Sequence, residues 1–242
     1  MFYIYEGAGS NPRLLGILSK DEHSKDSCQV LSATASHKVN NPSDLELVID
    51  ATHEINELIT DTSDVVLFDT YGNPQEYHVT EIEDVHEDTA ERTLYCEGSI
   101  VELNDSIIEE EMANISSTNP RDYLAHILQF TRWEIGEVDE GVYNSKWEAI
   151  NELVGSNCLN ALNEFLKKYN CEFSCRYVLE NNVITRRILD IKTQIGKNVG
   201  KRFEYEKDVN SIKRHMDSSN VKTAIFPRIG LKGKQTKKVI KK

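Results

Sequence analysis

The chain has 242 residues, 39% of them hydrophobic and 28% charged, which is long enough to bury a core without disulfide or metal staples. Its formal net charge of −12 is unevenly divided. Residues 1–200 carry 15 Lys and Arg against 36 Asp and Glu, whereas residues 201–242 carry 13 against 4. The acidic excess argues against general DNA binding, which needs basic side chains at the phosphates. No apolar run approaches the roughly 20 residues that cross a bilayer.

The cysteines indicate a protein made inside a cell with reduced thiols, and the two ends of the chain have distinct compositions. Residues 1–5 lack the basic region and cleavage site of a secretion signal, so we expect an immediate strand instead. Five cysteines, an odd number, favour free thiols over a disulfide framework. Residues 231–242 hold six lysines and no acid. We interpret them as a solvated, disordered tail, with contact to an acidic neighbour or nucleic acid as the alternative.

Residues 1–105 are predicted to form a β domain. Apolar and polar side chains alternate in segments about ten residues apart, with polar turns between them, as is typical of a barrel or sandwich. The predicted strand segments are residues 45–50, 65–68, 77–80 and 94–103. Residues 71–74, Tyr-Gly-Asn-Pro, predict a turn. Residues 52–58 fit either a helical turn or a loop.

Residues 106–170 are predicted to form a helical module. Asn119 suits an N-cap, Pro120 the first helical position, and Asp122 the positive end of the helix dipole. Another helix is predicted to begin at a capping box, residues 145–148, and to end at Gly155. Residues 133–135 indicate a short strand. The apolar stripes of the first and last helices are Leu124, Ile127 and Leu128, and Leu159, Leu162, Phe165, Leu166 and Tyr169.

Residues 171–200 are predicted to form a β-hairpin module, because the apolar period changes to two. Asn181 and Asn182 predict a type I′ turn, and Gly196 and Gly200 bracket a polar crossover. The predicted inward side chains are Phe173, Cys175, Tyr177 and Leu179, then Val183, Thr185, Arg187, Leu189 and Ile191. Two further strands are expected at residues 202–205 and 221–226. Strands, helices and strands in succession predict an α+β chain of several small subdomains.

The sequence predicts no catalytic, cofactor-binding or metal-binding residue. Residues 196–202 resemble a phosphate loop, but the spacing is one residue short and Arg202 stands where Ser or Thr would hold magnesium. Cys171 and Cys175 lie on one face of a strand about 13 Å apart, too far to share a metal, so we expect core packing. His126 is interpreted as a half-buried packing residue, and residues 109–111, all Glu, as a solvated face. Counting residues alone leaves a Cys–His thiol peptidase open.

Four segments, in order along the chain, carry a family resemblance: residues 65–84, 145–170, 171–212 and 219–224, the last reading Ser-Asn-Val-Lys-Thr-Ala. Together they resemble the N-terminal region of siphophage tail proteins called minor structural protein, prophage endopeptidase tail or tail-associated lysin. The resemblance implies a multi-subdomain tail-hub fold with two β-barrel-like domains and smaller helical and α+β modules between them. Residues 1–105 would form the first barrel, and residues 201–230 would supply strands of the second.

The resemblance also implies a function: a structural, non-enzymatic virion protein at the distal tip of a long non-contractile tail, synthesised in the host bacterial cytoplasm. Three copies would form a hub whose barrels mimic sixfold symmetry, dock on the distal tail protein hexamer and meet the C-terminus of the tape measure protein. DNA would pass through during genome ejection without specific binding, repelled by acidic side chains, and this chain would not insert into a membrane. The expected contact elements are the edge strands of the barrels and the N-terminal residues 2–5.

Two alternatives remain beside the hub. The family often carries a peptidoglycan-cleaving domain, which would make this a tail peptidase or muramidase, but a lysine-rich end follows Gly230 here and the lytic activity is not carried over. A host-surface or carbohydrate-binding module would use exposed aromatic side chains. Because Trp133 and Trp147 lie in or beside apolar helical patterns, we expect burial rather than sugar stacking.

Overall fold

The computed structural model describes residues 1–7, 12–20, 27–86, 90–108, 119–146, 155–196 and 200. Several predicted features lie outside these residues. They are the acidic residues 109–111, Trp147 with most of its predicted helix, the strands expected at 202–205 and 221–226, and the lysine-rich end. The second barrel-like domain and the proposed subdomain limits therefore stay predictions.

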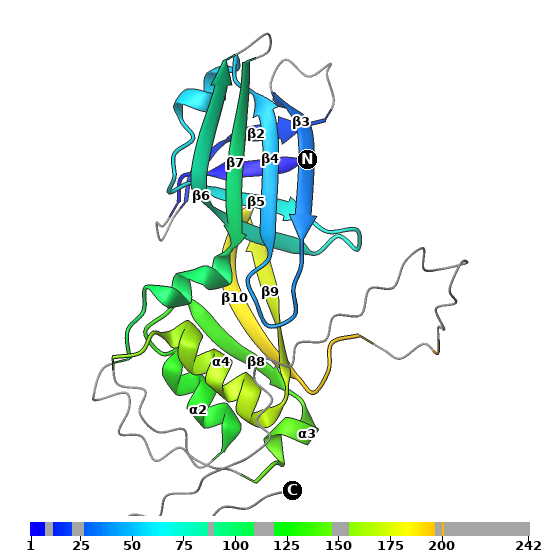
Figure 1. Cartoon of the computed structure of the whole chain (residues 1–242), viewed down its shortest axis with the longest axis vertical. Helices are drawn as coiled ribbons and strands as arrows, with labels where there is room; N and C mark the ends of the chain where they lie inside the picture. The colour runs from blue at the N-terminus through cyan, green and yellow to red at the C-terminus, as the bar shows by residue number, and fades with distance from the viewer. Residues whose placement is uncertain are drawn as a thin grey trace, which may run out of the picture. The chain divides into compact units, whose positions relative to one another are not determined.

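Seven strands form a closed barrel in the order β1-β2-β3-β4-β7-β6-β5, with β5 pairing back to β1 (Figure 1). Their bounds are β1 Phe2–Tyr5, β2 Leu14–Ser19, β3 Cys28–Ser36, β4 Asp44–Asp50, β5 Asp64–Phe68, β6 Pro74–His86 and β7 Ala90–Gly98. Every neighbouring pair is antiparallel except β2 and β3, which are parallel and matched at only two positions, Leu18 with Cys28 and Ser19 with Gln29. The predicted β domain is thus a barrel rather than a sandwich.

Alternating side chains fill the barrel. Leu45, Leu47 and Ile49 of β4 are all buried, as the period of two predicts. Tyr77 and Val79 of β6 join the same core, which confirms the predicted alternation there. The turn before β6 is also confirmed: the Asp69 carboxylate accepts hydrogen bonds from the backbone N–H groups of Tyr71 and Asn73, and Gly72 has φ of +83°.

The strand predicted over residues 94–103 ends early. β7 stops at Gly98, and Ser99–Asn104 forms the 3₁₀-helix η2. Ile100 and Leu103, three residues apart, are both buried, and this spacing suits a helical turn better than a strand. Gly98 donates a hydrogen bond to the Ser43 carbonyl at 2.7 Å, where a side chain would crowd the Ser43 backbone. The undecided residues 52–58 contain a second 3₁₀-helix, η1, at Glu54–Glu57.

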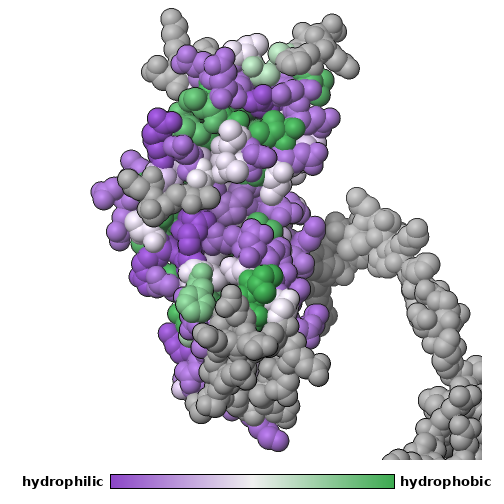
Figure 2. All heavy atoms as spheres, turned by 90° about the vertical axis from the view of Figure 1, so that its left-hand side faces the viewer, coloured by the Kyte–Doolittle hydropathy of each residue, from purple (hydrophilic) through white to green (hydrophobic). Residues whose placement is uncertain are grey.

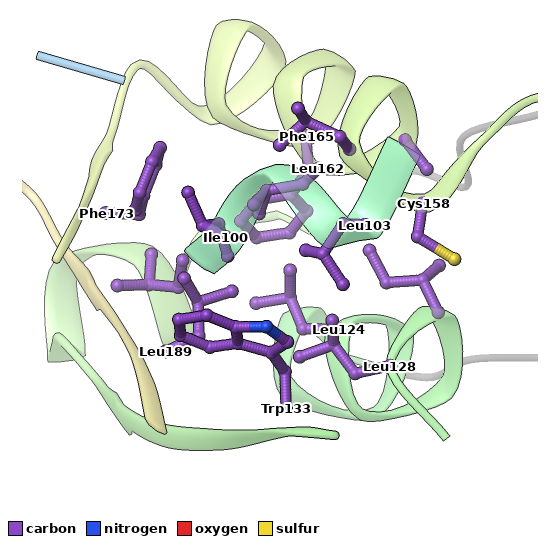
Figure 3. Close-up of a cluster of buried hydrophobic side chains, with 14 of the residues drawn as sticks. Ile100, Leu103, Leu124, Leu128, Trp133, Cys158, Leu162, Phe165, Phe173 and Leu189 are labelled. Atoms are coloured by element: carbon purple, nitrogen blue, oxygen red, sulfur yellow. The ribbon is translucent and has the colours of Figure 1, made fainter. Parts of the chain in front are cut away.

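The remaining elements form an α+β module with a core of its own. A three-stranded sheet has the order β8-β10-β9, with β10 antiparallel to β9 and parallel to β8. The bounds are α2 Pro120–Ile127, β8 Trp133–Val138, α3 Glu140–Tyr143, α4 Cys158–Tyr169, β9 Glu172–Glu180 and β10 Val183–Lys192. Figure 3 shows side chains from η2, α2, α4 and all three strands converging on this core.

Local sequence signals account for these elements. The Asn119 side chain accepts a hydrogen bond from the Asp122 N–H at 2.9 Å, which confirms the predicted N-cap of α2. Asn181 and Asn182 have φ of +51° and +63°, which confirms the type I′ turn. The alternation predicted on the second hairpin strand is wrong at Thr185, which is exposed. The register of β10 against β9 slips between Ile184 and Arg186, so Ile184 is buried instead.

Apolar side chains are kept mostly inside these two cores. The face shown in Figure 2 is largely hydrophilic, with a few small apolar patches. Trp133 is 3% exposed, which confirms its predicted burial and removes it as a sugar-stacking platform. Among the described residues, no helix is both long and apolar enough to cross a membrane.

Candidate functional site

At the junction between the barrel and the α+β module, strands β1 and β5 are buried on both faces, because they lie between the two cores. Ile4 of β1 and Val65 of β5 point into the barrel core, whereas their neighbours Tyr5 and Val66 point outward into the core of the module. This explains why the apolar N-terminal run lacks polar alternation. It also corrects the expectation that residues 2–5 contact other chains, because Phe2, Ile4 and Tyr5 are at most 8% exposed within this one.

A buried ion pair crosses the junction. Arg187 of β10 donates two hydrogen bonds to Glu76 of β6, from Nε to Oε2 at 2.6 Å and from Nη2 to Oε1 at 2.5 Å. Glu76 is 3% exposed and Arg187 is 5% exposed. Such a two-pronged pair fixes both the distance and the orientation of the partners. The barrel and the hairpin are therefore locked in one register.

Four further hydrogen bonds hold the hairpin. Asn40, in the loop between β3 and β4, donates from its side-chain amide to the Cys171 carbonyl at 3.0 Å and accepts from the Phe173 N–H at 3.1 Å. It thereby supplies both bonds that a neighbouring strand would make with the start of β9. The Ser99 hydroxyl donates to the Tyr177 hydroxyl at 3.1 Å. At the hairpin tip, the Tyr5 hydroxyl donates to the Asn182 carbonyl.

A second charged cluster lies on the barrel side of the junction. The His78 ring contacts the carboxylates of Asp64 and Glu102 on opposite sides, the latter with 3.6 Å between Nε2 and Oε2. Arg132, just before β8, donates to the same Glu102 oxygen at 2.5 Å. The cluster borders a cleft of about 450 Å³ with Phe130 at its edge. Two cations alternate with two carboxylates here, so the charges largely compensate one another.

The environment of His78 keeps its ring protonated. Burial is the largest single influence and lowers the pKa, but the hydrogen bond with Asp64 and the approach of Glu102 together outweigh it and raise the pKa to about 9. At neutral pH both ring nitrogens therefore carry protons and donate. An imidazolium has no lone pair with which to accept a proton, so the cluster is suited to electrostatic fixing rather than to general-base catalysis.

Because His78 belongs to this cluster, we expect the free energy of unfolding to fall in alkaline solution. The folded pKa lies above the unfolded value near 6.5, so the contribution of His78 is complete below about pH 6.5 and is lost as pH rises through about 9. One proton gives a slope of at most about 1.4 kcal/mol per pH unit. Denaturant unfolding of the native chain and of His78→Gln at pH 6 and pH 10 measures the difference. An equal fall in both proteins would contradict the assignment, since other groups would then cause it.

The cysteines and the remaining histidine candidate behave as packing residues. All five thiols are free, and burial raises the pKa of Cys96 and Cys175 to about 12, which makes them poor nucleophiles. Cys171 and Cys175 both contact the module core, as predicted. His126 is half-buried on α2, and burial lowers its pKa, in line with the packing interpretation. Within the described ranges, no three His, Cys, Asp or Glu side chains converge as metal ligands.

Sequence reasoning did not find the residues of the junction. Arg187 does carry a signal, because it is the one charged side chain on the predicted inward face of the hairpin, and a charge in such a position indicates a buried partner. Glu76 gave no comparable signal, since it lies out of phase with its apolar neighbours Tyr77 and Val79. Asn40 was hidden in a polar loop, where an amide is unremarkable.

Comparisons with known proteins place the fold. No protein-family model matches the chain, and no curated protein matches it. Among solved structures, prophage tail protein gp18 from Listeria monocytogenes EGD-e aligns with a TM-score of 0.59 at 17% identity, covering 99% of this chain and 67% of that protein. The chain thus has the fold of a phage tail protein, which confirms the resemblance predicted from its sequence at the level of fold.

Two further solved structures align more weakly. The E. coli c3393 protein, a type VI secretion component described as structurally similar to T4 tail proteins gp27 and gp5, aligns with a TM-score of 0.48 at 12% identity over 70% of this chain. The 43 kDa tail protein of prophage MuSo2 from Shewanella oneidensis aligns with a TM-score of 0.47 at 12% identity over 78%. This chain spans 47% and 52% of those two proteins.

Proposed function

We propose that the chain is a structural hub protein at the distal tip of a long non-contractile phage tail. The observation that carries this proposal is the fold match to a prophage tail protein along 99% of the chain. The junction gives physical support: a closed barrel pinned to its module by a buried ion pair is suited to transmit position and load, and its charged groups are already paired. Such a protein would act through its shape and its assembly with other tail proteins, without catalysis.

The proposed assembly is a homotrimer that docks on the hexameric distal tail protein. Residues 1–105 supply one barrel-like domain, and residues 201–230 supply strands of a second, so that three copies present six similar surfaces. Partners are the distal tail hexamer and the C-terminus of the tape measure protein. Residues 1–200 carry a charge balance of −21, which repels phosphate and lets the genome slide through the ring during ejection.

Mass in solution tests this proposal. The purified chain of 27.6 kDa is expected to form a trimer of about 83 kDa, three times that mass, either alone or after addition of the distal tail protein of the same phage. Native mass spectrometry distinguishes the monomer, dimer and trimer directly. A chain that stays monomeric under both conditions and clears cell wall in a zymogram would contradict the hub and favour the hydrolase alternative.

A further inference from the structure

The barrel has a strand edge that no described strand covers. β3 pairs with β4 along residues 32–36, but on its other side it pairs with β2 only at Cys28 and Gln29. Residues 31–36, Leu-Ser-Ala-Thr-Ala-Ser, thus keep a free edge within the described part of the chain. Six residues of strand extend about 20 Å, the length of an ordinary strand pairing.

This edge lacks the features by which proteins normally block strand addition. Charged side chains, proline or a covering element are the usual protection of an edge. Residues 27–37 contain none of Asp, Glu, Lys, Arg or Pro. Five of the six side chains in residues 31–36 are exposed, and Ala33 is half-buried. The edge is accessible, and its side chains are mostly small.

Two other incomplete edges in the described part of the chain are partly covered by side chains. The start of β9 is satisfied by Asn40, as described above. The β8 edge is approached by Arg121, which donates to the Gly136 carbonyl at 2.6 Å. The contrast points to residues 31–36 as an edge left open for a partner.

We propose that a strand of a neighbouring copy of this chain adds to β3 at residues 31–36, in a head-to-tail contact that closes the ring. This proposal rests on the proposed trimer and identifies one of its contact surfaces. The free backbone N–H and C=O groups select an extended segment. An uncharged edge also suits contact between copies whose first 200 residues carry a balance of −21, because like charges elsewhere repel.

A charge placed on the inward face of this edge tests the proposal. Ala35 is exposed in the chain and lies opposite Leu45, on the barrel-facing side of β3. Ala35→Lys leaves the lysine in water in the monomer but confines it beside an added strand, so the trimer-to-monomer midpoint concentration should rise at least about tenfold. Ala125→Lys, the same change at an exposed position of α2, serves as the control and should leave the midpoint unchanged. Circular dichroism confirms that both variants fold.

Hydrogen exchange gives a second, backbone-specific measurement. The amides of residues 31–36 that point away from β4 should exchange at least about tenfold more slowly in the trimer than in the diluted monomer. A trimer that persists in Ala35→Lys with unchanged exchange overturns this edge while leaving the hub proposal standing. If these amides become protected only when the distal tail protein is added, the edge binds that protein, and the proposal that a second copy pairs with it is wrong. A native chain that never assembles removes the proposed trimer itself.

Discussion

Arg187→Ala is expected to lower the free energy of unfolding by about 3–5 kcal/mol, one of the two largest effects we expect from a single substitution. The reason is the carboxylate of Glu76, which is 3% exposed and receives both hydrogen bonds from Arg187. Without the guanidinium, a buried charge is left without a partner, or must take up a proton. Urea unfolding at neutral pH and fixed protein concentration measures the loss.

The neighbouring residue provides a matched control. Arg186 pairs with Glu134 at 2.6 Å, but both side chains are about half exposed, at 53% and 51%. Exposed pairs contribute about 0–1 kcal/mol, so Arg186→Ala should change stability little. The double variant Glu76→Met/Arg187→Met removes both charges and should recover much of the loss. Equal losses in Arg187→Ala and Arg186→Ala would show that burial does not set the energetics of this pair.

Local sequence signals were sufficient for elements whose period and caps are set by near neighbours. The α2 cap at Asn119, the apolar stripe of α4 and the turn at Asn181 and Asn182 each depend on contacts within a few residues. The end of β7 shows where local signals stop being sufficient. The sequence around Ile100 and Leu103 predicts a continuing strand, because a short apolar run fits either period until its packing partners are known.

The junction could not be predicted because its partners are far apart in the sequence. Glu76 and Arg187 are 111 positions apart, and Asn40 and Cys171 are 131 apart. No periodicity within a single strand reveals which outward-facing side chain meets another element. The apolar residues 2–5 had two explanations, an intermolecular contact or a second buried face, and only the position of β1 between two cores decides between them.

The second large effect is expected at Phe165, at the centre of the module core. Its side chain is 0% exposed and stacks on Tyr123 with 5.7 Å between ring centroids, and Tyr169 lies 4.8 Å away on another side (Figure 3 shows the surrounding side chains). Phe165→Ala removes these contacts and leaves a cavity, so the free energy of unfolding should fall by about 3–5 kcal/mol. Phe130, 75% exposed, is the control, and Phe130→Ala should stay within about 0.5 kcal/mol of the native chain.

The way in which Phe165→Ala unfolds carries as much information as the size of the loss. The module core includes Tyr5 and Val66, which lie on strands of the barrel. The ion pair of Glu76 with Arg187 also connects the barrel to the module. When the destabilised module unfolds, the barrel should therefore unfold in the same transition. Tryptophan fluorescence and far-ultraviolet circular dichroism, followed on one urea gradient, should give a single coincident transition. Two separated transitions, with strand signal kept after the first, would show that the barrel stands without the module and that the junction does not couple them.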